Sequence, residues 1–174
     1  MVLSLKRLSK TIQKGNKQGM VGLMNIWEQV DLDYARARRR AFVAGLWAWV
    51  RRRCASLCSF DEARWELGAE NRRYVGTKTV EVSRIVGSVG RWRDFDRGFM
   101  PTRASEQRWK RVDLAFREGL DLPPVVLYKI GGDYYVHDGN HRVSVARSKG
   151  VEMIDAEVTE FFPARRMGSS GAAA

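Results

Sequence analysis

The 174-residue sequence has only two cysteines, Cys54 and Cys58, and only two histidines. The cysteines lie four residues apart in a segment expected to be helical, which is a poor geometry for a local disulfide. Two thiols are also too few for a zinc site unless His137 and His141 came close to them. Buried structural thiols are the commoner case. The sequence therefore predicts neither a disulfide framework nor a resident metal.

Long apolar runs are missing as well. The longest, residues 41–50, is about half the length of a bilayer crossing and is followed directly by three arginines. Residues 1–20 contain lysines but no sustained apolar stretch and no small-residue cleavage site, unlike a secretory signal. We therefore expect a cytoplasmic protein without a membrane-spanning segment.

Acidic residues are outnumbered by basic ones. The chain has 31 Lys and Arg against 20 Asp and Glu, a formal net charge of +11 and a pI near 10.2. Such an excess suggests polyanionic partners: nucleic acid, nucleotide phosphates or an anionic membrane surface. With 44% hydrophobic residues, a chain of this length buries one ordinary core. Composition alone identifies no site, so the motifs must do so.

Three regions are expected along the chain. Residues 1–70 form a basic helical extension, residues 71–163 a globular domain, and residues 164–174, "ARRMGSSGAAA" with its small polar residues, a disordered tail. In the extension, residues 31–53 have acids at the start and arginines at the end, as the helix dipole favours. The segment "SFDEARWELG", residues 59–68, predicts a second helix with a Ser-Glu capping box and a terminal glycine.

The pattern of the globular region predicts an α+β fold. From Gly76 apolar and polar residues alternate, as in a half-buried strand, and a charged loop follows, "RWRDFDRGFMPTR". Residues 104–118 then place Trp109, Val112 and Phe116 on one helical face. The segment "VVLYKIGGDYYVH" predicts two strands joined by a glycine hairpin. A helix over residues 140–149 and a last strand in "MIDAEVTEF" complete the domain.

The motif "DGNHR", residues 138–142, follows the hairpin and opens the last helix. Gly139 lets the backbone turn and approach a ligand, and Asn140 is expected to cap the helix. The free N–H groups of the first turn then form an anion cradle, beside which His141 and Arg142 add donors. Positive charge in a first turn costs about 0.3–1 kcal/mol per group without an anion and is stabilising with one. The motif therefore predicts a phosphate site.

A structural alternative stays open for the same residues. Gly139 and Asn140 would then only make a turn and a cap, while the basic pair that follows them would bind nearby acids such as Asp138 or Asp155. The segment "RWRDFDR" has a similar alternative as a salt-bridged surface loop.

Residues 76–162 resemble the superfamily that joins the ParB N-terminal domain, sulfiredoxin and the archaeal free-serine kinases. In ParB-like domains a strand ending in Ile leads to a turn and an arginine, and "VEVSRIVGSVGRWRDFD" places Arg91 there, with Phe95 and Asp96 after it. The proline before "VVLYKI" and the glycine-led basic motif also match. ParB proteins write that motif GERR, sulfiredoxins GGCHR and the serine kinases DGHHR, to which "DGNHR" is closest.

The resemblance implies a small mixed sheet with helices and a nucleotide site, with CTP, ATP or ADP and Mg²⁺ as its ligands. The phosphates would lie at the DGNHR turn, and two aspartates would hold Mg²⁺ through water or orient a nucleophile. The implied cofactor-binding residues are Arg91, Asp138, Gly139, Asn140, His141 and Arg142, and the implied catalytic residues are Asp94 and Asp96.

Departures from the relatives restrict the activity. Asn140 stands where sulfiredoxins carry their reactive cysteine, which excludes sulfinic-acid repair by that route. The serine kinases place a glutamate base just after the first strand, and "GSVGR" offers none. ParB proteins continue into a helix-turn-helix module, which this sequence does not, so we do not expect sequence-specific DNA binding of that kind.

Three hypotheses remain. The first, which we favour, is a nucleotide-binding module, with or without slow triphosphate hydrolysis, coupled to DNA or to a protein partner. The second is a phosphotransferase acting on a small hydroxyl substrate, and the third is a DNA-binding or nuclease-like protein. A homodimer is among the expected assemblies. The arginines expected to contact DNA, or else to form a solvated helix surface, are Arg36, Arg38, Arg39, Arg40, Arg51, Arg52 and Arg53.

Overall fold

The computed structural model describes residues 21–50 and 57–163. This part of the chain contains four α-helices and a six-stranded mixed sheet, which confirms the α+β prediction. The predictions for the first 20 residues, for the disordered tail, for Cys54 and for the arginines at 51, 52 and 53 lie outside the described residues.

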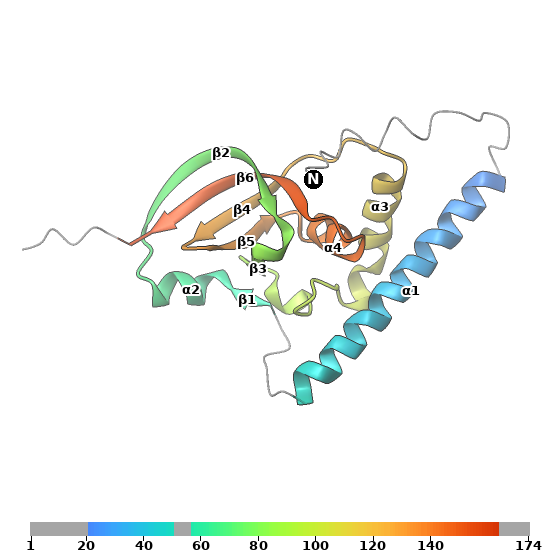
Figure 1. Cartoon of the computed structure of the whole chain (residues 1–174), viewed down its shortest axis with the longest axis horizontal. Coiled ribbons are helices and arrows are strands. Elements are labelled where there is room, and N and C mark those ends of the chain that lie inside the picture. The colour runs from blue at the N-terminus through green and yellow to red at the C-terminus, as the bar shows by residue number, and fades with distance from the viewer. Residues whose placement is uncertain (1–20, 51–56, 164–174) are drawn as a thin grey trace, which may run out of the picture.

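The strands form one sheet in the order β1-β3-β5-β4-β6-β2 (Figure 1). The predicted hairpin joins β4 and β5 as antiparallel neighbours, with Gly131 at a φ of 58° in its turn. Parallel pairs β4–β6, β3–β5 and β1–β3 make the sheet mixed. The strands are β1 (Cys58–Ser59), β2 (Asn71–Glu81), β3 (Ile85–Ser88), β4 (Val125–Ile130), β5 (Asp133–Asp138) and β6 (Met153–Phe162).

The helices are α1 (Val21–Val50), α2 (Phe60–Glu66), α3 (Glu106–Arg117) and α4 (Asn140–Ser148). The last two lie close to their predicted positions. The helix α1 already includes residues 21–30, so the predicted start at Asp31 was wrong. Acidic residues favour the first turn of a helix, but they do not prevent a helix from extending further towards the N-terminus when residues there are packed. Val30, which precedes Asp31, is fully buried. No helix in the described part of the chain is long and apolar enough to cross a membrane.

Two faces of the sheet carry different helices. On one face, Val143 and Ala146 of α4 join the main core formed by side chains of β4, β5 and β6. On the other face, Phe60 of α2 makes edge contacts with the rings of Tyr135 and Phe161, at centroid distances of 5.7 and 5.0 Å. Residues 58–66 therefore belong to the sheet and to the helix packed against it, although they precede the globular region expected from the sequence.

The capping box predicted for α2 does not form. Ser59 is the N-cap residue, but its side chain makes no capping hydrogen bond. It is buried and belongs to β1, where it pairs with Ser88, so strand pairing fixes this residue instead. The predicted glycine stop is present, since Gly68 has a φ of 56° just after the helix.

A third layer is formed by α1, which packs against α3 (Figure 1). Tyr34 and Ala37 of α1 share a buried cluster with Trp109 of α3 and Val145 of α4. The indole N–H of Trp109, which is fully buried, donates to the Ser144 hydroxyl at 2.8 Å. Helix α3 is thus fixed between the other two.

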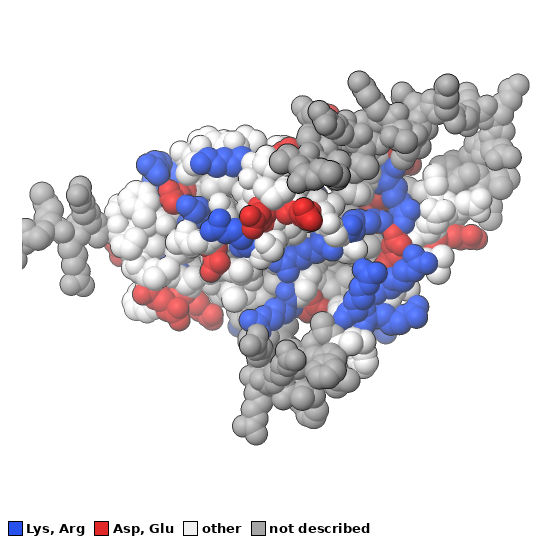
Figure 2. Space-filling model, viewed as in Figure 1, with Lys and Arg blue, Asp and Glu red and all other residues white. Residues whose placement is uncertain are grey.

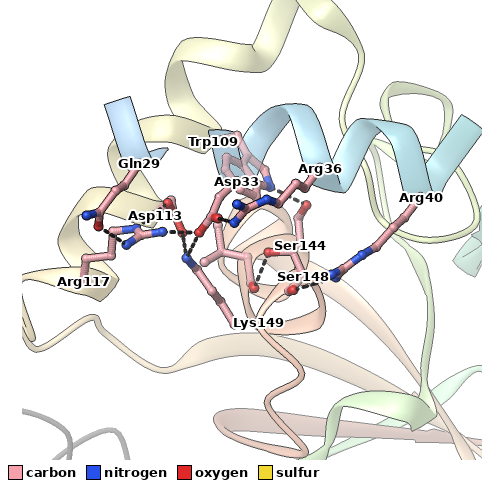
Figure 3. Close-up of polar contacts among 11 residues, drawn as sticks. Gln29, Asp33, Arg36, Arg40, Trp109, Asp113, Arg117, Ser144, Ser148 and Lys149 are labelled. Atoms are coloured by element: carbon pink, nitrogen blue, oxygen red, sulfur yellow. Dashed lines mark hydrogen bonds and ion pairs between the residues drawn. The ribbon is translucent and has the colours of Figure 1, made fainter. Parts of the chain in front are cut away.

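Charged groups at the C-terminal ends of α3 and α4 connect these two helices with α1 (Figure 3). The fully buried carboxylate of Asp113 accepts a hydrogen bond from Arg117 Nε at 3.1 Å. Lys149 Nζ lies 2.8 Å from its other oxygen, an ion-pair contact without hydrogen-bond geometry. Arg117 and Lys149 also bind Asp33 of α1. Burial would raise the pKa of Asp33, but Lys149 and Arg117 outweigh it and hold that pKa below its ordinary value.

Replacing Asp113 tests this cluster. In Asp113→Asn, two partly buried cations lose one of the two carboxylates that they share, and we expect the free energy of unfolding to fall by about 3 kcal/mol. Urea unfolding of the variant and the parent protein measures the change. The matched control is Asp133→Asn, at an exposed hairpin position, which should change stability by less than about 0.5 kcal/mol. Equal effects of the two substitutions would contradict a stabilising role for the cluster.

Candidate functional site

The site centres on the turn between β5 and α4. Gly139 lies in this turn with a φ of 99°, and it is the N-cap residue of α4. A Cβ atom at this position would lie 2.7 Å from Val125 Cγ1 and 3.0 Å from Arg142 Nε. Both the backbone angle and the close approach therefore require glycine.

The first turn of α4 presents free backbone donors. The first helical bond runs from the N–H of Val143 to the carbonyl of Gly139 at 3.0 Å. The N–H groups of Asn140, His141 and Arg142 consequently have no acceptor within the helix. Aligned N–H groups at a helix start form a cradle for anions, because the helix dipole adds partial positive charge there.

The prediction that Asn140 caps the helix was wrong. The left-handed conformation needed at the cap suits Gly139, and Asn140 becomes the first helical residue. Its side chain is buried, and Oδ1 has no hydrogen-bond partner among the described residues. A buried polar atom without a partner is uncommon and often marks a functional position.

His141 is the most unusual group of the site. Its ring is only 6% exposed and contacts the Phe95 ring edge-on at 5.1 Å. Neither ring nitrogen has a partner among the described residues. Burial lowers its pKa to about 4, with further lowering by Arg91 and Arg108 and an opposing effect of Asp94. His141 is therefore neutral at pH 7, with one N–H to donate.

Arg142 already has partners. Its guanidinium donates to the carbonyls of Pro123 and Pro124 and forms an ion pair with Asp138 at 2.5 Å. This is the pairing that the structural alternative expected for the motif. In this conformation Arg142 braces the loop before β4, and Asp138 balances its charge.

Arg91 and Asp94 lie near His141, to judge from their effects on its pKa. They form a partly exposed ion pair at 2.8 Å at the short 3₁₀ turn Trp92–Asp94. This agrees with the salt-bridged alternative for the loop. Arg91 also lowers the pKa of His141, so its charge acts on the start of α4.

Asp96, unlike Asp94, forms hydrogen bonds with backbone N–H groups. One of its carboxylate oxygens accepts the backbone N–H groups of Gly98 and Met100, both at 2.8 Å. These bonds close a turn around buried Phe99, which has a φ of 64°. The charge of Asp96 acts on Arg147. Asp96 shapes the loop, while Asp94 is the aspartate brought toward His141.

Tertiary packing brings two further arginines into contact with the loops or charges around the site. Arg108, an exposed residue of α3, lowers the pKa of His141 although no motif marked it. Only the packing of α3 beside α4 brings it there, so the sequence carried no local signal. Arg147 of α4 donates to the carbonyls of Val82, Ile85 and Arg97 and lies over the Phe99 ring at 4.7 Å.

The arrangement suits an anion better than a metal. The charges of Arg91 and Arg108 act on a neutral, buried imidazole at the start of a helix. The nearby carboxylates of Asp94 and Asp96 are already engaged. Within residues 21–50 and 57–163, no group of three or more His, Cys, Asp or Glu residues is placed to hold a metal ion.

Comparisons with known proteins give little guidance. The chain matches no family model, and no curated protein matches it. A solved structure that resembles it is sulfiredoxin from Arabidopsis thaliana, at 19% sequence identity and a TM-score of 0.36. That match covers 47% of this chain and 82% of the sulfiredoxin chain. A likeness of this size carries no argument about function, so the site is interpreted from its own residues.

The environment of His141 predicts a pH dependence of stability. Between about pH 6.5 and pH 4 the unfolded chain binds a proton at this residue and the folded chain does not, so stability falls as the pH falls through this range. The full loss is on the order of 3 kcal/mol. Urea unfolding from pH 7 to pH 4, compared with His141→Leu, measures it. If the variant kept the same pH dependence over this range, another group would be responsible.

Proposed function

We propose that the chain is a phosphate-binding module of the ParB/sulfiredoxin type that holds a nucleotide at the start of α4. The observation that supports this most strongly is the buried ring of His141, whose nitrogens have no partner among the described residues, beside the free first-turn N–H groups. Buried polar groups are normally hydrogen-bonded, so a ligand oxygen is the partner that this turn is suited to receive.

Each residue has a distinct part in the proposed binding. Phosphate oxygens accept the backbone N–H groups of the turn, which Gly139 leaves accessible, and the N–H of His141. Arg91 and Arg108 supply the charge that neutral His141 lacks. Asp138 and Arg142, as a pair, hold the loop that flanks the turn.

We propose CTP, ATP or ADP with Mg²⁺ as the nucleotide ligand. Mg²⁺ keeps several waters when it binds protein, so one carboxylate is enough to hold it beside a triphosphate. Asp94 is the better placed of the two aspartates, because its charge acts on His141. Slow triphosphate hydrolysis remains an open alternative within this proposal, as does transfer to a small hydroxyl substrate.

Titration of the purified protein with CTP, ATP, ADP and GTP in the presence of Mg²⁺ tests the proposal. The two histidines provide a second readout by NMR: binding should raise the pKa of His141, because a bound phosphate stabilises the imidazolium. Inorganic pyrophosphate should produce the same shift, and failure of all five ligands to bind would overturn the proposal.

Arginine variants make this test specific. Arg91→Gln and Arg108→Gln should each weaken nucleotide affinity roughly tenfold, since each removes a charge that acts on the cradle. The matched control is Arg111→Gln, an exposed residue of the same helix, which should leave affinity unchanged. Phosphate release, followed in the parent protein and in Asp94→Asn, separates hydrolysis from binding alone.

Nucleic acid is the second proposed partner. Arg36, Arg39 and Arg40 are exposed on α1, whereas Arg38 donates to the carbonyl of Pro101 at 3.2 Å. Figure 2 shows Lys and Arg side chains gathered on the side of the molecule where α1 lies. Duplex DNA should bind through phosphate contacts and lose more than roughly tenfold in affinity between about 50 and 200 mM salt. Replacing the three exposed arginines by Gln should reduce the salt dependence. Binding that is indifferent to salt would argue against this surface.

A further inference from the structure

A second candidate site lies on another side of α4. A cavity of about 400 Å³ opens between this helix, the end of α3, the loop before β4 and the strands β2 and β6. Its walls are mainly apolar and include Phe116, Leu122, Val125, Ala146, Val151 and Ile154. Ligand pockets for small molecules typically measure about 300–1,000 Å³ and are lined in this way.

The cavity uses a different face of α4 from the phosphate cradle. Arg142 and Ala146, four residues apart, line the cavity and therefore share one face. His141 contacts Phe95, and Val145 packs in the cluster with Trp109, on the face toward α3 and the loop after β3. The two sites therefore lie on different faces of the helix, although they adjoin at Arg142, whose backbone N–H belongs to the cradle and whose side chain lines the cavity.

The acidic groups that line the cavity have no ion-pair partner among the described residues, whereas the basic group has one. Asp121 and Asp155 line it, and neither forms an ion pair with any described residue. One oxygen of Asp155 accepts the Thr79 hydroxyl at 2.9 Å, which leaves its charge uncompensated. The one cation in the lining, Arg142, is balanced by Asp138. The net charge offered to an occupant is negative.

We propose that this cavity binds a small organic cation, an amine attached to an apolar or aromatic body. The body fills the apolar walls, and burial of its surface supplies most of the affinity. The ammonium group pairs with the carboxylates of Asp155 and Asp121, which line the cavity without an ion-pair partner among the described residues, since opposite charges attract. A ligand with the same apolar body but a carboxylate in place of the amine is disfavoured, because both aspartates repel it.

A set of three probes with one ring system and different charge tests this assignment. Tryptamine is cationic, tryptophol is its neutral counterpart and indole-3-acetate is an anion. Calorimetric titration of the full chain should show affinity in the order tryptamine, tryptophol, indole-3-acetate. Equal or tighter binding of the anion would overturn the assignment, and so would failure of all three probes to bind.

Variants locate the bound amine. Asp155→Asn keeps the acceptor for Thr79 and should weaken tryptamine binding roughly tenfold while leaving tryptophol unchanged. Ala146→Leu should block both probes by filling the cavity, in a protein whose cooperative thermal unfolding shows that it is folded. Asp133→Asn, an exposed carboxylate on the β4–β5 turn, is the control. Loss of binding in the control, or unchanged tryptamine binding in Asp155→Asn, would contradict the proposal.

A last measurement separates this site from the proposed nucleotide site. Tryptamine affinity should be the same within twofold in the presence of saturating pyrophosphate, and Arg108→Gln should leave it unchanged. Competition between the two ligands would show that they share one site and would overturn the assignment of a separate cavity ligand. Absence of pyrophosphate binding would count against the nucleotide proposal alone.

Discussion

The fully buried carboxylate of Asp113 is the group on which the arrangement of the helices depends. It joins Arg117, at the end of α3, to Lys149, just after α4, and both cations also bind Asp33 of α1. A buried charge of this kind is tolerated only when its partners are held in place. The three helices are therefore fixed relative to one another at one end of α4. Its other end, the phosphate cradle, keeps its position beside α3 for that reason.

Helix α4 separates two environments of opposite charge. Around His141, the guanidinium groups of Arg91 and Arg108 act together with the partial positive charge of the helix start. On the cavity side, Asp155 faces apolar walls without an ion-pair partner among the described residues. Arg142 lies between these regions and is balanced by Asp138, so it adds little net charge to either. Anions and cations are thus favoured on different faces of one short helix.

Local patterns in the sequence were enough to predict the elements that carry their own signals. The glycine hairpin, the amphipathic face of Trp109 and Phe116, and the turn at Gly139 depend on backbone angles and periodicity, and each was found. The start of α1 and the structural role of Asp96 depend on tertiary packing, which a single sequence does not display. Arg108 belongs to the same class, because it acts on His141 only through the contact of two helices. The β1 strand at Ser59 is too short to produce a pattern.

Any chemistry at the cradle depends on how Asp94 responds to a ligand. The pair between Arg91 and Asp94 is the contact that a bound phosphate would compete for, because a phosphate carries more charge than one carboxylate. Once Arg91 turned to the phosphate, Asp94 would lose its partner while its charge remained near His141. A carboxylate in that state is suited to hold a hydrated Mg²⁺ or to orient a water molecule. Ligand binding and the appearance of a catalytic group would then be one event, so the proposed slow hydrolysis would not need a base that is free before the ligand binds.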